Sequence, residues 1–177
     1  GLIAQSGDFD VPASIQAGMA IDLRPNLTLM ADYRFIDYSA IHAVANPSTK
    51  PAPLGNGPGF GWHDVNVFKI GLEWRATPTS TYRVGYSHND NPIKSADVMF
   101  NILAPGVTQD HFTAGAEFQL SEKLSLELAG AYVPSASVNG YETALGNPQH
   151  AVEIEMSQYE FTVGVKYVTD NLREPLK

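Results

Sequence analysis

The stretch that decides the fold runs from Phe112 to Tyr132 and reads FTAGAEFQLSEKLSLELAGAY. From Phe112 to Leu120 every second side chain is apolar, and the residues between them are polar or small. After a turn at residues 121–123 the alternation resumes, with apolar side chains at Leu124, Leu126 and Leu128. A period of two is typical of an extended strand, because successive side chains point to opposite faces of a sheet. The stretch therefore predicts a β-hairpin with one apolar face and one polar face.

The composition of the 177-residue chain excludes several classes of protein. Charged residues make up only 17% of it, against roughly 25% in soluble domains, which favours a β-rich or membrane-embedded chain. The formal net charge of -8 argues against nucleic acid as a partner, because phosphate binding requires clustered Lys and Arg. The chain has no cysteine and therefore no disulfide framework. No apolar run approaches the roughly 18 to 20 residues of a spanning helix, so a membrane form would be a barrel or a peripheral protein.

The same alternation recurs along the chain and predicts seven strands in all. Beyond the hairpin, strands are expected at residues 11–24, 27–38, 63–75 and 81–88, with a last strand ending at Tyr167. The first of them is long compared with the roughly 5 to 6 residues usual in soluble proteins. In the last strand the apolar positions change from even to odd numbers near Ser157, which a β-bulge would explain.

The connections between these strands alternate in length. Short turns are expected at residues 25–26, 76–80 and 121–123, and long loops at about 39–62, 89–108 and 134–151. Outer-membrane barrels have this asymmetry, with short periplasmic turns and long extracellular loops. Aromatic residues also gather at both strand ends, as in the two interfacial girdles of such barrels: Trp74, Tyr82 and Phe118 near the short turns, and Tyr86, Phe112 and Tyr132 near the long loops.

These patterns predict an all-β fold, a transmembrane antiparallel β-barrel. A soluble β-sandwich is the alternative, because its strands also alternate apolar and polar residues. Seven strands are an odd number, whereas bacterial single-chain barrels have even numbers, so the chain is expected to supply part of a larger barrel. Residues 1–10 are expected to end an extracellular loop, residues 11–168 to form the barrel strands and their loops, and residues 169–177 to form a C-terminal tail. Leu126 then faces lipid, and a charge there is expected to cost about 2 to 4 kcal/mol.

Three segments carry a resemblance to a known family: DVPASIQAGMAIDLRPNLTLMADYRFIDYS at 10–39, FKIGLEWRATPTSTYRVGYSHNDNPI at 68–93 and PGVTQDHFTAGAEFQLSEKLSLELAGAYV at 105–133. In this order and spacing they resemble the C-terminal half of the FadL/TodX family of outer-membrane transporters for hydrophobic compounds. The resemblance covers about residues 8 to 167.

The resemblance implies a fourteen-stranded barrel plugged by an N-terminal hatch. Such a barrel admits long-chain fatty acids or aromatic hydrocarbons and releases them sideways through a gap in its wall. The present sequence lacks the half that would hold the hatch and the gap. It also departs from the pattern at its end, because VTDNLREPLK follows Tyr167 where these barrels commonly finish on an aromatic residue.

The polar face carries the candidate ligand residues, which in a barrel point into the lumen. Charges of opposite sign on neighbouring strands can pair there, so a structural ladder that holds hatch and wall together is one interpretation. The other is that a basic member meets a ligand carboxylate, with Arg34, Lys69 and Arg83 as the candidates. Glu117 and Glu127 are expected to face the same lumen.

A second candidate site is an apolar cluster in the loop at 89–108, with spacing that suits a short helix. Its members are Ile93, Val98, Met99, Phe100, Ile102 and Leu103. Exposed apolar patches usually mark binding sites, so the cluster could be a capture surface for hydrophobic ligands. It could equally form the core of its own loop.

Catalytic chemistry has no support in the sequence, and the chain is expected not to be an enzyme. The five histidines are dispersed without the spacing of metal ligands, and no GxSxG or phosphate-binding loop occurs, so neither a metal nor a cofactor is expected. The sequence predicts passive uptake of hydrophobic small molecules across the outer membrane of a Gram-negative bacterium. The expected partners are the hydrophobic ligand, membrane lipid, lipopolysaccharide and the missing N-terminal half. The alternatives are a non-transporting barrel that acts as an adhesin or structural protein, and a soluble β-sandwich binding module.

Overall fold

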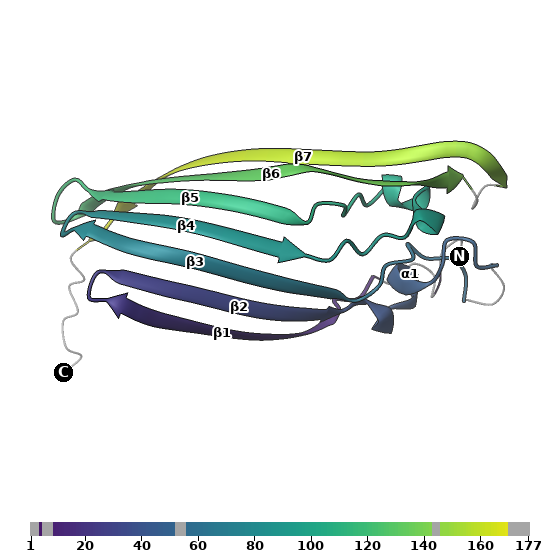
Figure 1. Ribbon diagram of the computed structural model, residues 1–177, viewed down its shortest axis with the longest axis horizontal. Helices are drawn as coiled ribbons and strands as arrows, with labels where there is room; N and C mark the ends of the chain where they lie inside the picture. The colour runs from purple at the N-terminus through teal and green to yellow at the C-terminus, as the bar shows by residue number, and fades with distance from the viewer. Residues whose placement is uncertain (1–3, 5–8, 52–55, 143–145, 170–177) are drawn as a thin grey trace.

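The computed structural model describes residues 4, 9–51, 56–142 and 146–169. The described residues form one antiparallel sheet in which seven strands follow one another in chain order, each hydrogen-bonded to the next (Figure 1). The strands are β1 (Ala13–Arg24), β2 (Leu27–Asp37), β3 (Val65–Thr77), β4 (Ser80–Asn89), β5 (Asp110–Gln119), β6 (Leu124–Glu142) and β7 (Asn147–Tyr167). The all-β, seven-stranded antiparallel prediction is confirmed.

The two faces of the sheet are unlike, as the alternation predicts. In register, Phe112 of β5 lies opposite Tyr132 of β6, and Glu117 lies opposite Glu127, so in this hairpin the aromatic residues share one face and the acidic residues share the other. On the apolar face large side chains stay open along the strands; Ile15 of β1 is 73% exposed and Val165 of β7 is 70% exposed. A soluble sandwich would cover this face with a second sheet. We call the apolar face the outer face and the polar face the inner face.

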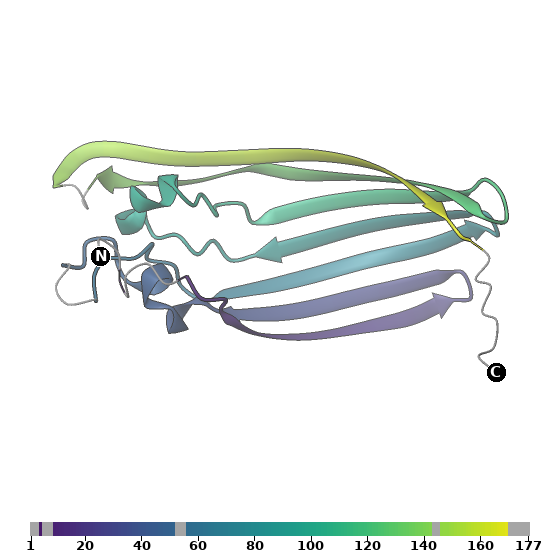
Figure 2. The same ribbon diagram turned by 180° about the vertical axis from the view of Figure 1, so that it is seen from behind.

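Short helical turns lie in the connections at one end of the sheet, visible in Figures 1 and 2. They are η2 (Tyr38–Ala40), α1 (His42–Ala45), η3 (Ser95–Asp97) and η4 (Phe100–Ile102). Among the described residues no helix is both long and apolar enough to cross a membrane. The expected long loops at about 39–62 and 89–108 match the gaps between β2 and β3 and between β4 and β5. The predicted ends of the chain, at 1–10 and 169–177, fall mostly outside the described residues.

The third expected long loop, at 134–151, is wrong as a loop. β6 continues to Glu142 and β7 begins at Asn147, so most of this stretch is paired strand. The pairing runs from Ala136 opposite Met156 to Tyr141 opposite Ala151. The sequence did not reveal these strands, because the apolar residues here no longer occupy the positions that continue the earlier alternation. In this part of β6 and β7 the apolar side chains lie on the inner face.

The expected bulge near Ser157 lies in the partner strand instead. Val133 pairs with Gln158 and Ala136 pairs with Met156, so β6 carries one residue more than β7 between these pairs. The extra residue falls at Pro134 or Ser135, and a proline fits a bulge because it has no N–H to donate. From Ala151 to Tyr167 the side chains of β7 therefore alternate between the faces without a break, and the even-numbered ones face inward.

A small core forms where this extended β6–β7 hairpin meets the loop before β5. On the inner side, Val138 and Ile154 pack against three buried residues of the loop, which are Ile93, Val98 and Val107. Three partly buried side chains cover this cluster: Trp62, Val152 and Met156. Gly140 is required here, because a Cβ on it would clash with the backbone carbonyl oxygen of Ser95.

Two buried polar residues connect the loops at the end of the sheet that carries the helical turns. Asp97 is 3% exposed and accepts hydrogen bonds from the backbone N–H of Ser48 at 2.6 Å and from its hydroxyl at 2.8 Å. Asn101 is fully buried; its amide donates to the carbonyl of Phe60 at 2.7 Å and its oxygen accepts from Nε1 of Trp62 at 2.5 Å. The described parts of 38–62 and 93–107 thus form one unit, which we call the loop cap.

Candidate lumen and lipid-facing surfaces

A row of charged side chains crosses the inner face near the short turns. In it, Arg83 of β4 donates to Glu73 of β3 at 2.8 Å and to Glu117 of β5 at 3.2 Å. Glu117 also meets Lys166 of β7 at 3.9 Å. The row continues toward β1, where Arg75 lies 3.7 Å from Asp22. We call these six residues the ion band: Asp22, Glu73, Arg75, Arg83, Glu117 and Lys166.

The ion band supports the structural interpretation of its members. Its side chains are between 24% and 70% exposed, so each pair contributes on the order of 0.2 to 1 kcal/mol at most. Glu117 and Glu127 lie directly opposite each other in register, and two like charges there repel. Arg83 and Lys166 offset that repulsion at Glu117. The predicted lumen residue Arg83 is thus already engaged by two carboxylates.

The other two candidate cations are not neutralised in this way. Lys69 of β3 lies opposite Asp32 and Ser87 in register, but no carboxylate of the described residues comes within 4.0 Å of its amine. Arg34 of β2 donates to the hydroxyl of Ser14 at 3.2 Å, which leaves its charge uncompensated within the described part of the chain. The structure therefore separates three residues that the sequence could not rank.

A smooth groove of about 480 Å³ runs along the inner face beside the ion band. Its lining includes Arg83, Thr113, Glu160 and Thr162, and its floor is built from small residues: Gly71, Gly85, Gly115, Ala129 and Ala131. A Cβ on Gly85 would lie 2.7 Å from the hydroxyl oxygen of Thr113, so a larger residue there would require the Thr113 side chain to move. Because no side chain of this floor is larger than a methyl group, an apolar molecule has room to lie along the wall.

At the loop end of the sheet, Asp90 fastens the connection after β4 to the start of β3. Its carboxylate accepts from the backbone N–H of Asn66 at 2.9 Å and from the Asn66 side-chain amide at 2.8 Å. These hydrogen bonds, the backbone one first, hold the pKa of Asp90 below its ordinary value, because they stabilise the charged form. The role is structural, since both donors belong to the wall.

Two aromatic belts border the outer face. Toward the loops, the centroid of the Phe112 ring lies 5.1 Å from that of Tyr86 and 6.5 Å from that of Tyr132. The Tyr132 ring in turn lies 5.0 Å from the ring of Tyr159. Toward the short turns, the Tyr82 ring lies 5.9 Å from Trp74 and 6.0 Å from Phe118. We call the first four residues the upper belt and the last three the lower belt. Tyr167, which belongs to neither belt, ends β7. It lies about 26 Å along the strand from Tyr159 of the upper belt, or about 20 Å after the usual tilt, close to the height of a barrel's apolar band.

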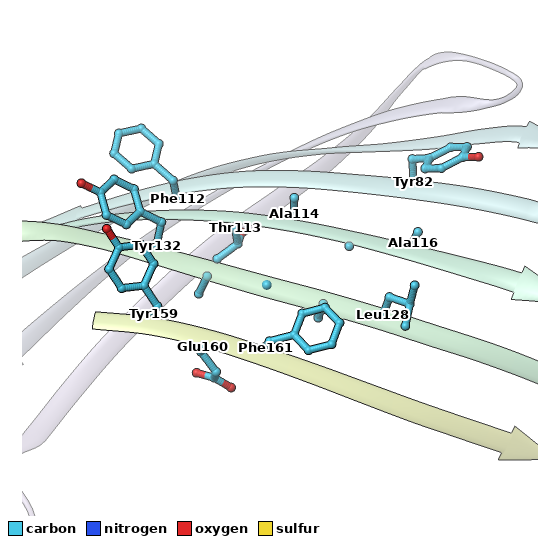
Figure 3. A pocket seen from close by; sticks show the side chains of 14 residues that line it. Tyr82, Phe112, Thr113, Ala114, Ala116, Leu128, Tyr132, Tyr159, Glu160 and Phe161 are labelled. Carbon is cyan, nitrogen blue, oxygen red and sulfur yellow. The ribbon is translucent and has the colours of Figure 1, made fainter. Parts of the chain in front are cut away.

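A wider hollow of about 850 Å³ lies between these belts (Figure 3). Its side chains include Phe112, Tyr132, Tyr159 and Phe161, all on the outer face, whereas Glu160 points to the other side of the sheet. The hollow therefore opens toward lipid and does not belong to the lumen. The smaller inner groove, which lies beside the charges, is the better candidate for a channel wall.

The structure divides the apolar loop cluster between its two interpretations. Ile93 and Val98 are buried in the small core described above, at 5% and 0% exposure. Met99 and Phe100 are half-buried, whereas Ile102 and Leu103 are 52% and 82% exposed. Two 3-10 turns, η3 and η4, replace the expected short helix.

The described residues contain no group of three or more His, Cys, Asp and Glu side chains that could hold a metal ion. His88 is paired with Asp110 at 2.8 Å and His150 with Glu142 at 2.8 Å, and both contacts hold neighbouring strands together. Neither arrangement places a nucleophile beside a base.

A two-faced antiparallel sheet with an exposed apolar face, aromatic belts and a charged inner face defines the wall of a membrane-spanning β-barrel. A family model described as "Outer membrane protein transport protein (OMPP1/FadL/TodX)" matches residues 4–169. The chain belongs to this family, whose members are outer-membrane β-barrel transport channels of Gram-negative bacteria.

Solved structures show the same fold at low sequence identity. The toluene transporter TodX of Pseudomonas putida superposes with a TM-score of 0.61 at 18% identity, covering 90% of this chain and 35% of TodX. A FadL homologue of Pseudomonas aeruginosa gives 0.62 at 17%, covering 88% and 35%. The Ralstonia pickettii toluene transporter TbuX gives 0.52 at 14%, covering 90% and 34%. The chain thus spans about a third of the length of these proteins. No curated protein sequence matches it.

Proposed function

We propose that the chain forms part of the wall of an outer-membrane channel for passive uptake of hydrophobic small molecules. The observation that carries this proposal is the inner groove, whose floor of small residues lies beside a band of paired charges. An apolar solute moves along such a floor without forming strong contacts. The solved relatives described as toluene transporters support an aromatic hydrocarbon, and the FadL membership supports a long-chain fatty acid.

The rest of the barrel is part of the proposal. Within the described residues β1 pairs only with β2 and β7 only with β6, so each has one edge of unpaired backbone groups. Backbone groups in lipid must be paired, and a closed barrel is the way in which strands achieve this. We propose that the full-length protein has the size of these relatives and that its remaining part supplies seven further strands and a hatch. We also propose that the barrel lies in the outer membrane, in contact with lipopolysaccharide.

Uptake by cells tests the function directly. Cells that produce the full-length protein are expected to accumulate labelled oleate or labelled toluene faster than cells without it, and without a nucleotide requirement. Equal accumulation of both compounds in the two strains would leave an adhesin or structural barrel as the better assignment.

A charge reversal at Lys69 distinguishes the two kinds of ligand. Because the amine of Lys69 has no carboxylate partner among the described residues, we expect Lys69→Glu to weaken oleate binding about tenfold, the value of one charged hydrogen bond. Toluene has no charge, so its uptake is expected to stay the same. Tritiated oleate binding to the purified protein in detergent measures the first effect.

Arg83→Gln, which removes a cation that is already paired with two carboxylates, is the control for Lys69→Glu. Its guanidinium already meets Glu73 and Glu117, so we expect oleate affinity to change by less than about twofold. Arg34→Gln tests the remaining cation in the same assay. Unchanged oleate affinity in Lys69→Glu would remove Lys69 as a carboxylate site, and a larger loss in Arg83→Gln would transfer that role to the ion band.

We further propose that the capture surface is limited to the exposed end of the loop cluster, at Ile102 and Leu103. Replacing both with Gln is expected to lower uptake at limiting ligand concentration about fivefold. Burial of an apolar side chain against a ligand contributes roughly 1.5 to 3 kcal/mol, and each substitution removes part of that contribution. Lys94→Gln, an exposed exchange in the same loop, is the control. Uptake equal to that of the control would mean that the cluster serves only its loop.

A further inference from the structure

The outer hollow has a floor of small side chains framed by large ones. Along the row that crosses it, Ala114 of β5 pairs with Gly130 of β6, and Gly130 pairs with Phe161 of β7. One row higher lie the stacked rings of the upper belt, and one row lower Ala116 pairs with Leu128. The sequence of β5 and β6 therefore makes a depression about two strands wide in an otherwise bulky face (Figure 3).

The chemistry of the hollow selects an apolar occupant with a polar end. No charged side chain of the described residues points into it, since Glu160 lies on the inner face opposite Ala131. In Figure 3 the hydroxyl oxygens of Tyr132 and Tyr159 lie side by side at the end of the hollow remote from Leu128 and Tyr82. This end faces the loops, where the polar interface of the bilayer lies.

The wall beneath the hollow is closed. β5 and β6 pair without a register shift from Phe112 opposite Tyr132 to Gln119 opposite Ser125. No path therefore leads from the inner groove through this part of the sheet to the hollow. An occupant has to come from the bilayer, because the hollow is continuous with the exposed lipid-facing surface formed by residues such as Val163 and Val165.

We propose that the hollow is a specific binding site for one membrane lipid. An acyl chain lies on the floor of Ala114 and Gly130 between the two aromatic belts, and the ester or headgroup region of the lipid meets the hydroxyls of Tyr132 and Tyr159. The site holds the lipid longer than the rest of the outer face does, because only here can a chain sink between side chains instead of lying over them.

Spin-labelled lipid tests the proposal on the full-length protein. The protein is reconstituted in vesicles of phosphatidylethanolamine and phosphatidylglycerol with phosphatidylethanolamine labelled on its acyl chain. Electron paramagnetic resonance is expected to show a motionally restricted population that loses one lipid per protein in the Ala114→Leu, Gly130→Leu double variant. The new side chains fill the floor, and Gly130 has room for a Cβ, its nearest neighbour being the carbonyl oxygen of Glu160 at 3.6 Å.

Two further variants keep the test decisive. Ala17→Leu enlarges an exposed outer-face residue of β1 far from the hollow and is expected to leave the restricted population unchanged. Tyr132→Phe with Tyr159→Phe keeps both rings and removes both hydroxyls, so it is expected to lose the same lipid even if the double leucine variant does not fold. An unchanged population in the tyrosine variant, or displacement of the labelled lipid from the wild-type protein by added toluene, would overturn the lipid assignment.

Discussion

Arginine at Val163 is expected to lower the free energy of unfolding in lipid by about 2 to 4 kcal/mol. Val163 of β7 is 57% exposed on the outer face, midway between Tyr159 and Tyr167. A charge there would lie near the middle of the bilayer, where neither water nor a carboxylate is at hand. Denaturant titration of the protein in vesicles, followed by its heat-modifiable gel mobility, measures the loss.

The neighbouring residue provides the control. Thr162 projects from the inner face, where its hydroxyl already donates to Glu160 at 3.3 Å, so an arginine there would meet water and a carboxylate. We expect Thr162→Arg to cost less than about 1 kcal/mol. Equal costs at the two positions would contradict the assignment of the faces.

Leu126 is a less suitable site for this test than the sequence suggested. It lies opposite Phe118 and Val165, two residues from the start of β6 and therefore close to the short turn that precedes this strand. Because the cost of a charge falls toward the interfaces, Leu126→Arg is expected to cost less than Val163→Arg. The same titration ranks the two.

Replacing Asn101 by Leu is expected to destabilise the loop cap by about 2 to 4 kcal/mol. The substitution keeps the volume but leaves Nε1 of Trp62 and the carbonyls of Phe60 and Asp97 without their buried partner. Each buried group that loses its hydrogen bond costs on the order of 1 to 3 kcal/mol. The sheet itself should remain folded, since the strand pairings do not involve Asn101.

Trp62 reports on the cap in this experiment. The chain has two tryptophans, so a Trp74→Phe background leaves Trp62 as the fluorophore. Iodide is expected to quench Trp62 more strongly in Asn101→Leu than in the parent. Asn139→Leu, a similar exchange at an exposed residue of β6, is the control. Equal quenching in all three proteins would show that the cap does not depend on Asn101.

The seven strands and their two faces were predictable from the sequence because alternation is a local property. The short turns and the long loops at about 39–62 and 89–108 followed from breaks in that alternation. The loop expected at 134–151 was not predictable as strand, since the bulge at Pro134 or Ser135 changes the phase and hides a continuing pair. Whether a phase change marks the end of a strand or a bulge depends on the partner strand.

The sequence predicted only part of the candidate site, because the rest also depends on partner strands. The sequence indicated that Arg34, Lys69 and Arg83 share a face. It could not show that Arg83 lies between Glu73 and Glu117, because those contacts join β3, β4 and β5 in one register. Nor could it show that Ile93 and Val98 are buried while Leu103 is exposed, because a hairpin about forty residues later supplies their cover.

The sequence by itself determined that this protein presents its apolar side chains outward along a barrel wall, since a period of two and the placement of aromatic residues need no distant partner to be recognised. The tertiary structure alone decided which charges are already paired, where the loops join into one cap, and where the outer face sinks into a hollow. Each of these depends on the register between strands and on contacts between loops, and such long-range geometry is not encoded in any single stretch of the chain.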